Sequence, residues 1–277
     1  MGIVLILLGV CFVSGCLEQK QSDSASEKKV SIAGSTTVHP LIEIIAESFN
    51  EELDNNVSVI ISGGGTGVGI NGIVENRIDI AMASREVTAG EREQSPEKKF
   101  IETPIGYDAI VIVVSPPVYA GGVKSLTKDQ LRGIYAGNIT NWKEVGGPDR
   151  EIYVVGRKSG SGTLTSFNEL VMGSATAQSP GVGSTVDGNA EAKGAVAESD
   201  KAIGYVGLKF AAGGVNAVKF NGVEASVNTI KDGSYPLARK LYLVTYGNAS
   251  PEAQQFIDYV VGPKGQSIAL VNGYIPL

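Results

Sequence analysis

Short apolar segments alternate with amphipathic segments along most of the chain, and this alternation constrains the fold more than any other feature. In residues 40–53, for example, Leu41, Ile44, Ile45 and Phe49 fall on one face of a helix. Because strands that alternate with helices form sheets covered by helices, we expect an α/β fold with mostly parallel strand pairs. The expected strands are 30–33, 57–61, 78–83, 109–115, 152–155, 203–206 and 241–246, and the expected helices are 40–53, 70–75, 127–135, 164–172, 190–198, 250–261 and 264–270.

Three turns rich in glycine and hydroxyl side chains join expected strands to expected helices. They are residues 34–37, 62–69 and 159–163. The first backbone N–H groups of a helix carry a partial positive charge, so such turns can hold an oxyanion. Ser and Thr also cap helices in all kinds of proteins, so one such turn would indicate little. Three of them, with Arg85 and Arg157 nearby, favour an anion site, because a guanidinium group can bond two oxygens at once.

The N-terminal residues have the pattern of an export signal. Residues 3–13 are apolar but too few for a comfortable transmembrane helix, and residues 13–16 (VSGC) resemble the lipobox of exported lipoproteins. We predict a signal peptide over residues 1–15 and lipid modification of Cys16. The alternative is a short uncleaved anchor, since no Lys or Arg precedes the apolar run. Both interpretations place the protein outside the cytosol, attached to the membrane.

Residues 16–29 differ in composition from the rest of the chain. Residues 17–29 are rich in Ser, Gln and charged residues, and Leu17 is their only apolar residue besides alanine. Such a segment cannot bury a core, so we predict a flexible tether and a folded part that begins near Val30.

The composition excludes several classes of protein. The only cysteines are Cys11 and Cys16 and the only histidine is His39, which excludes a disulfide framework, a zinc finger and a Cys/His metal cage. We therefore expect no metal and no cofactor. The net charge of −6 disfavours non-specific binding of nucleic acid. A Ser-His-Asp triad would have to use His39, which stands beside Pro40 at an expected helix start, where surface packing is the simpler role.

Two short motifs match known enzymes but fit poorly here. Residues 67–72 match G-x-G-x-x-G, yet the next strand ends in Ser84-Arg85, and an exported chain meets no supply of nicotinamide cofactor. Residues 125–128 match S-x-x-K, but no K-T-G follows. Thr127 and Gln130 instead form the capping box of a helix.

Five blocks occur in consistent order between Val30 and the C-terminus. They are AGSTTVHPL (33–41), SGGGTGVGI (62–70), DIAMASR (79–85), RKSGSGT (157–163) and AIGYVGL (202–208). This ordered set resembles the phosphate-binding proteins of ABC phosphate importers. The resemblance implies a two-domain clamshell, the type II periplasmic-binding-protein fold, with mixed sheets flanked by helices and two crossing segments. It implies one α/β domain of residues 30–115 and 237–277, a second of residues 116–236, and crossings near residues 106–109 and 235–237.

The resemblance also implies ligand contacts at matching positions. Arg157 would be the main counter-charge. Some family members place a proton-accepting carboxylate just after the strand of the third block, where this chain has Ser84 and Arg85. Three carboxylates could replace it: Glu86, Asp108 and Asp187. The implied phosphate-binding residues are Ser35, Thr36, Thr37, Thr66, Ser84, Arg85, Arg157, Ser161, Gly162 and Thr163.

The function implied by the resemblance is that of an extracytoplasmic, lipid-anchored phosphate-binding component of an ABC transporter. Such a protein is a monomer that delivers inorganic phosphate to the permease subunits and catalyses no reaction. Two alternatives stay open: a binding protein for another oxyanion, such as sulfate, molybdate or tungstate, and a secreted phosphate-ester hydrolase. A hydrolase would need an activated nucleophile or a metal cluster, and the sequence shows neither.

Overall fold

The computed structural model describes Gly2, residues 28–52 and residues 57–277. The predicted signal peptide, Cys16 and most of the predicted tether lie outside the described residues. Within the described part, no helix has both the length and the apolar character needed to cross a membrane.

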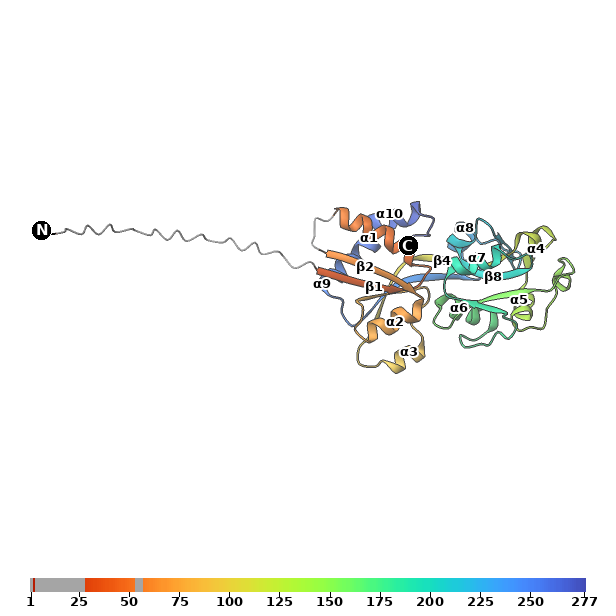
Figure 1. The fold of residues 1–277 in the computed structure, drawn as a ribbon, viewed down its shortest axis with the longest axis horizontal. Helices are drawn as coiled ribbons and strands as arrows, with labels where there is room; N and C mark the ends of the chain where they lie inside the picture. The colour runs from red at the N-terminus through yellow and green to blue at the C-terminus, as the bar shows by residue number, and fades with distance from the viewer. Residues whose placement is uncertain (1, 3–27, 53–56) are drawn as a thin grey trace.

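A nine-stranded mixed sheet runs through both halves of the described molecule (Figure 1). Its order is β2-β1-β3-β11-β4-β8-β6-β7, and the short strand β9 pairs with β4. The strands β5 and β10 form a separate parallel pair. The bounds are β1 Lys28–Gly34, β2 Val57–Gly64, β3 Ile80–Ala83, β4 Phe100–Val114, β5 Ser125–Leu126, β6 Tyr153–Arg157, β7 Ser184–Val186, β8 Ala202–Gly207, β9 Asn216–Ala217, β10 Lys219–Phe220 and β11 Ala238–Tyr246.

The helices form two lobes, one at each end of the sheet (Figure 1). The first lobe contains α1 His39–Glu52, α2 Thr66–Val74, α3 Ala89–Gln94, α9 Pro251–Val261 and α10 Pro263–Val271. The second lobe contains α4 Pro116–Ala120, α5 Lys128–Tyr135, α6 Gly162–Phe167, α7 Asn189–Ala197 and α8 Val227–Lys231, with 3₁₀ turns at Trp142–Val145 and Leu208–Phe210 and a π turn at Asn168–Met172. The capping box of Thr127 and Gln130 is present at the start of α5, where Lys128 is the first helical residue.

Strand direction changes at the middle of the sheet. The pairs β1–β2 and β1–β3 in the first lobe, and β6–β7 and β6–β8 in the second, are parallel. The central pairs, in which β11 joins β3 to β4 and β4 joins β8, are antiparallel. The predicted α/β class with mixed sheets is therefore confirmed, whereas alternation alone predicted mostly parallel pairing.

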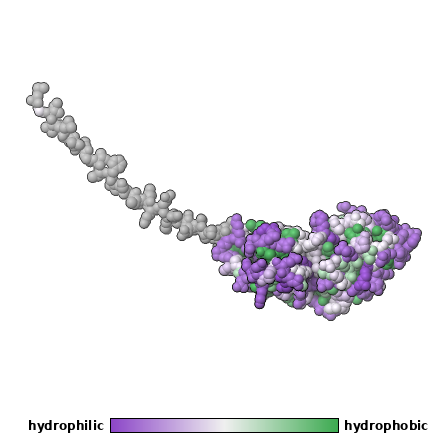
Figure 2. All heavy atoms as spheres, turned by 90° about the horizontal axis from the view of Figure 1, so that it is seen from below, coloured by the Kyte–Doolittle hydropathy of each residue, from purple (hydrophilic) through white to green (hydrophobic). Residues whose placement is uncertain are grey.

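Strand periodicity separates the apolar cores. In β3, Ile80 and Met82 pack into one core with α1 and α9, while Ala81 and Ala83 pack into another on the opposite face of the sheet with α2. The second lobe has its own core, drawn from residues 109–237 and Ile275. Polar side chains predominate on the outer face shown in Figure 2, with apolar atoms only in small groups.

Two segments cross between the lobes. Strand β4 pairs with β11 as far as Ala109 and with β8 from Ile110 onward. The second crossing lies beside it, because the N–H of Ile110 donates to the carbonyl of Leu237 at 2.9 Å and the Tyr235 hydroxyl donates to the carbonyl of Ile110 at 2.9 Å. Two paired chains that pass from one core to the other are the physical basis of a hinge.

Candidate functional site

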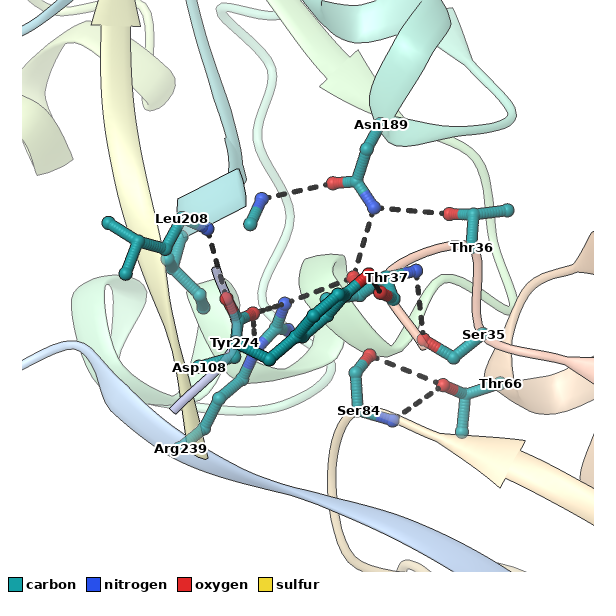
Figure 3. A network of polar contacts seen from close by, with 12 residues as sticks. Ser35, Thr36, Thr37, Thr66, Ser84, Asp108, Asn189, Leu208, Arg239 and Tyr274 are labelled. Carbon is teal, nitrogen blue, oxygen red and sulfur yellow. Dashed lines mark hydrogen bonds and ion pairs between the residues drawn. The ribbon is translucent and has the colours of Figure 1, made fainter. Parts of the chain in front are cut away.

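The carboxyl ends of the parallel strands in both lobes meet at one place. The turns that follow β1, β2 and β3 in the first lobe face those that follow β6 and β7 in the second. Figure 3 shows Asn189, which follows β7, opposite Thr36 and Thr37. In open α/β sheets, ligands bind at the carboxyl ends of strands, where helix starts offer unpaired N–H groups. The three turns found in the sequence are among those that meet here.

The first lobe contributes buried hydroxyl groups. Ser35 and Thr37 are each 2% exposed in the turn between β1 and α1, and the Ser35 hydroxyl accepts from the Thr37 N–H at 3.2 Å. Thr66 begins α2, and its hydroxyl accepts from the N–H of Ser84 at 3.2 Å. The Ser84 hydroxyl lies 3.4 Å from that of Thr66, so the ends of β2 and β3 are tied together.

The second lobe contributes Arg157, the turn before α6, and Asn189. Arg157 ends β6 and is 4% exposed. Ser161 is the N-cap of α6, because its hydroxyl accepts from the N–H of Leu164. Ser161 therefore has the ordinary capping role that serine has at the start of many helices. Gly162 and Thr163 are buried in the first turn of α6. Asn189 begins α7 and is fully buried.

The lobes touch through backbone and small side chains. The N–H of Gly67 in the first lobe donates to the carbonyl of Gly160 in the second at 2.9 Å. A methyl group at Gly162 would lie 2.3 Å from the Thr66 hydroxyl oxygen and 2.7 Å from that of Ser84. The two turns therefore approach as closely as they do only because residue 162 lacks a Cβ.

The hydroxyl groups of Thr36 and Thr37 both receive hydrogen bonds from the second lobe. The Thr36 oxygen accepts from Arg157 Nη2 at 3.3 Å and from Asn189 Nδ2 at 3.2 Å. The Thr37 oxygen accepts from Asn189 Nδ2 at 2.9 Å and from Arg239 Nη2 at 3.3 Å. A hydroxyl oxygen has two lone pairs and one proton. Because two donors occupy the lone pairs of each oxygen, the proton of the Thr36 hydroxyl and that of the Thr37 hydroxyl are available to a further acceptor. Neither hydroxyl donates to a protein group within the described residues.

Arg157 is buried, and it forms no ion pair with any residue that the structure describes. Its Nη1 donates to Asn189 Oδ1 at 3.2 Å and its Nη2 donates to the backbone carbonyl of Asp187 at 2.8 Å. Burial lowers the pKa of Arg157 to about 10, with a smaller lowering from the positive charge of Arg239. The guanidinium therefore keeps its charge at neutral pH, and desolvation strengthens its attraction for an anion.

Arg239, by contrast, is neutralised by Asp108 in the crossing strands. Its Nη2 and Nε donate to Asp108 Oδ2 at 2.7 and 3.1 Å, and both side chains are 5% exposed. The remaining oxygen, Asp108 Oδ1, accepts from the N–H of Leu208 at 2.9 Å. Tyr274 completes this side of the site, because its hydroxyl donates to the carbonyl of Thr37 at 3.2 Å.

Arg85 is engaged with a carboxylate of its own lobe. Its two terminal nitrogens donate to both oxygens of Glu91 at 2.8 and 2.7 Å. Burial alone would raise the pKa of Glu91, but the hydrogen bonds and charge of Arg85 hold it below its ordinary value. The charge of Arg85 is therefore compensated within its own lobe, and its assignment to the ligand remains a prediction.

The three carboxylates that could replace a proton-accepting acid have other partners. Asp108 accepts hydrogen bonds from Arg239 and from the N–H of Leu208. Glu86 accepts from the Tyr242 hydroxyl at 3.1 Å, and Asp187 pairs at 2.8 Å with Lys158, both side chains being exposed.

Sequence reasoning missed Asn189, Arg239 and Tyr274 as members of the site. Asn189 had a recognisable signal, because it follows Gly188 at another strand-to-helix turn, after β7. Arg239 precedes the apolar part of β11, beside a predicted crossing, and it is buried although the neighbouring Lys240 is exposed. Tyr274 comes from the C-terminal segment, and only the fold brings it to Thr37.

The chain is similar to known proteins over nearly its whole length. A family model described as a PBP superfamily domain matches residues 19–264. The phosphate-binding protein PstS of Borreliella burgdorferi is 32% identical over 283 residues, covering 99% of this chain and 97% of that protein. A phosphate ABC transporter substrate-binding protein from Clostridium perfringens, solved with bound phosphate, is 35% identical with a TM-score of 0.83, covering 90% of this chain and 100% of that one. A phosphate transport receptor from Vibrio cholerae gives 31% identity and a TM-score of 0.73, with coverage of 90% and 100%.

Two lobes joined by paired crossing strands, with helix starts facing each other across the junction, define a two-domain binding protein of the periplasmic type. The chain belongs to the PBP superfamily and, within it, to the PstS family of phosphate-binding proteins. The predicted fold class and the predicted family are confirmed.

Proposed function

We propose that the protein captures inorganic phosphate between its lobes and delivers it to the permease of an ABC phosphate transporter. The observation that carries the proposal is the pair of hydroxyls at Thr36 and Thr37, whose oxygens are occupied by donors and whose protons are free for a further acceptor. Together with the unneutralised charge of Arg157, they form a site that offers donors only. The bound phosphate of the Clostridium perfringens relative supports the same ligand.

Calorimetry with inorganic phosphate tests this proposal. Thr37→Val keeps the shape of the side chain and removes the hydroxyl, so it should weaken binding by about 1.5–3 kcal/mol, the contribution of a hydrogen bond to a charged group. Thr103→Val on β4, away from the turns, is the control and should bind as the wild type does. Equal affinity in both variants would remove Thr37 from the site.

We also propose that the protein is not an enzyme. Binding and release through lobe closure require no chemical step, and the relatives are named as binding proteins. Turnover of p-nitrophenyl phosphate by the purified protein would instead support the hydrolase alternative.

The remaining alternative is that the protein binds a different oxyanion. Competition of phosphate with sulfate, molybdate and tungstate tests this alternative.

Membrane attachment and domain limits are part of the proposal. We propose cleavage before Cys16, lipidation of that cysteine, and residues 16–27 as the tether of a monomer on the outer face of the membrane; the predicted tether of residues 16–29 is two residues too long, because Lys28 and Lys29 pair with β2 as part of β1. A native protein that retained residues 1–15 and carried no lipid, as measured by intact-mass analysis, would contradict this.

We propose residues 30–115 with 237–277 as one domain and 116–236 as the other. Apart from Ile275, the core of the second lobe comes from residues 109–237. This range is close to the proposed limits of the second domain, 116–236, and so supports the division.

A further inference from the structure

Asn189 uses its whole hydrogen-bonding capacity at the lobe junction. Its Oδ1 accepts from the N–H of Gly207 at 3.1 Å and from Arg157 Nη1 at 3.2 Å. Its Nδ2 donates to the hydroxyl oxygens of Thr37 and Thr36 at 2.9 and 3.2 Å (Figure 3). An amide oxygen has two lone pairs and an amide nitrogen has two protons, so every position of this side chain is occupied.

The partners of this amide fix its orientation. A backbone N–H and a guanidinium group can only donate, so the atom that faces Gly207 and Arg157 must be the amide oxygen. The amide nitrogen therefore faces Thr36 and Thr37, and both hydroxyl oxygens have to accept from it. Because Asn189 is fully buried, bulk water does not reach these bonds.

The bonds of Asn189 divide between the two lobes. Those that its oxygen accepts come from the ends of β6 and β8 in the second lobe, so they hold the side chain whether the lobes lie together or apart. Those that its nitrogen donates go to the first lobe and can form only when the lobes approach each other. The two donors to the Thr36 oxygen, and one of the two donors to the Thr37 oxygen, belong to the second lobe. Lobe closure therefore fills the lone pairs of both oxygens.

We propose that Asn189 is a positioning residue that couples lobe closure to the polarity of the ligand site. In separated lobes, the hydroxyls of Thr36 and Thr37 keep lone pairs free and can act as donors or as acceptors. When closure brings Asn189 Nδ2 against them, they can only donate to a further group. The closed site thus selects a ligand that presents unprotonated oxygens. This inference rests on the proposed function, which assigns the anion to Thr36 and Thr37, and adds the residue that makes them donors.

The order of these events gives a kinetic test on the mature full-length protein. Bonds that form only on closure slow the release of a ligand and leave its first encounter unchanged. Asn189→Ala should therefore raise the dissociation constant for inorganic phosphate about tenfold or more, with the whole change in the dissociation rate constant. Calorimetry measures the dissociation constant, and displacement of bound radiolabelled phosphate by unlabelled phosphate measures the release rate. A change in the association rate constant alone would overturn the proposal.

Two further variants separate positioning from packing. Asn189→Leu keeps most of the side-chain volume and none of the hydrogen bonds, so phosphate should leave it as fast as it leaves Asn189→Ala. Asn168→Ala is the matched control, because Asn168 is a buried asparagine of the same lobe that donates to the carbonyls of Ala175 and Ala177. Its release rate should equal that of the wild type. Wild-type release from Asn189→Leu would mean that Asn189 only fills space.

A double-mutant cycle shows whether Asn189 acts through the threonines. Thr37→Val removes a hydroxyl that Asn189 orients, so the double variant should bind phosphate about twofold or more tighter than the product of the two separate losses predicts. Losses that simply multiply would contradict the proposal. If the wild type binds sulfate or molybdate but not phosphate, the proposed function fails, and the same cycle with that anion still decides the role of Asn189. A wild type that binds none of the three would contradict both.

Discussion

Arg157 differs from the other two arginines near the lobe junction, because no carboxylate in the described part of the chain pairs with it. Arg85 is paired with Glu91, and Arg239 is paired with Asp108. Within each pair the two opposite charges cancel, so neither pair carries a net charge. A buried charge that only amide, hydroxyl and carbonyl groups contact is costly unless a counter-ion completes it. The position of Arg157 is therefore best explained by an anionic ligand.

Replacement of Arg157 should weaken phosphate binding strongly. In Arg157→Ala the expected loss is about 2–5 kcal/mol, because a buried charged hydrogen-bonding partner disappears. Arg77→Ala is the control, since Arg77 and its partner Glu75 are both exposed. Calorimetric titration of both variants gives the comparison, and an unchanged dissociation constant for Arg157→Ala would exclude Arg157 from the site.

Discrimination against sulfate should be incomplete. An unpaired carboxylate facing the ligand would repel sulfate and accept the proton of phosphate. Here Asp108, Glu86 and Asp187 are all engaged with other groups. Sulfate should therefore displace phosphate at high concentration in competition binding between pH 5 and 8. Complete rejection of sulfate over that range would mean that an acid does face the ligand.

At the level of single residues, the sequence identified the hydroxyl turns and Arg157 as candidates, and their role toward a ligand stays a prediction; it did not identify the partners that contact them. The turns are local features, visible as runs of Gly, Ser and Thr before helices. Asn189, Arg239 and Tyr274 reach Thr36 and Thr37 from distant parts of the chain. Long-range partners of this kind depend on strand order, which no local pattern specifies.

Among the elements, those with strong periodicity were predicted well and the crossing strand was not. The helix expected at 40–53 is α1 at His39–Glu52, and the strand expected at 203–206 is β8 at Ala202–Gly207. Strand β4 was expected only over 109–115 but begins at Phe100. Its first half is not a continuous apolar run, and it contains Pro104 beside a register shift, where a strand tolerates proline.

The contact between α2 and α6 depends on Gly162. Gly162→Ala should force the turns apart, because the new methyl group would collide with the hydroxyls of Thr66 and Ser84. Phosphate affinity should fall as closure is hindered, while the folded lobes remain. The control is Gly194→Ala in α7, where a methyl group meets nothing within 4 Å and helix propensity improves. Equal binding by both variants would show that the lobes need not approach this closely.

The loop and short helix after β3 should be sensitive to acid. The pKa of Glu91 lies below its ordinary value of 4.5 in the folded protein. Its contribution to stability is thus fully present above the pKa of the unfolded chain, and it is lost as pH falls through the folded value. The difference in Tm between the wild type and Glu91→Gln should be largest near pH 7 and vanish in acid. Glu93→Gln, exposed on the same helix, serves as the control, and a difference that persists in acid would contradict the role of the ionised pair.

For the whole molecule, the ion pair of Asp108 and Arg239 connects the hinge to the ligand site. Asp108 lies on β4 and Arg239 on β11, and Asp108 also accepts from Leu208 in the second lobe. Arg239 in turn donates to Thr37 in the first lobe. One buried ion pair therefore connects both crossing strands to both lobes. The resemblance found in the sequence implied two crossing segments but did not imply this ion pair.

Asp108→Asn should change stability and phosphate affinity in opposite directions. Removing one partner of a buried ion pair leaves Arg239 uncompensated, which should lower the free energy of unfolding by about 3–5 kcal/mol. The same uncompensated charge lies beside Thr37, so it should attract the anion and tighten phosphate binding in protein that is still folded. Asp200→Asn breaks an exposed pair with Arg150 and should cost about 0–1 kcal/mol without affecting binding. Denaturant unfolding and calorimetry together check this, and a parallel loss of stability and affinity would mean that Asp108 serves the site by holding the hinge geometry rather than by neutralising Arg239.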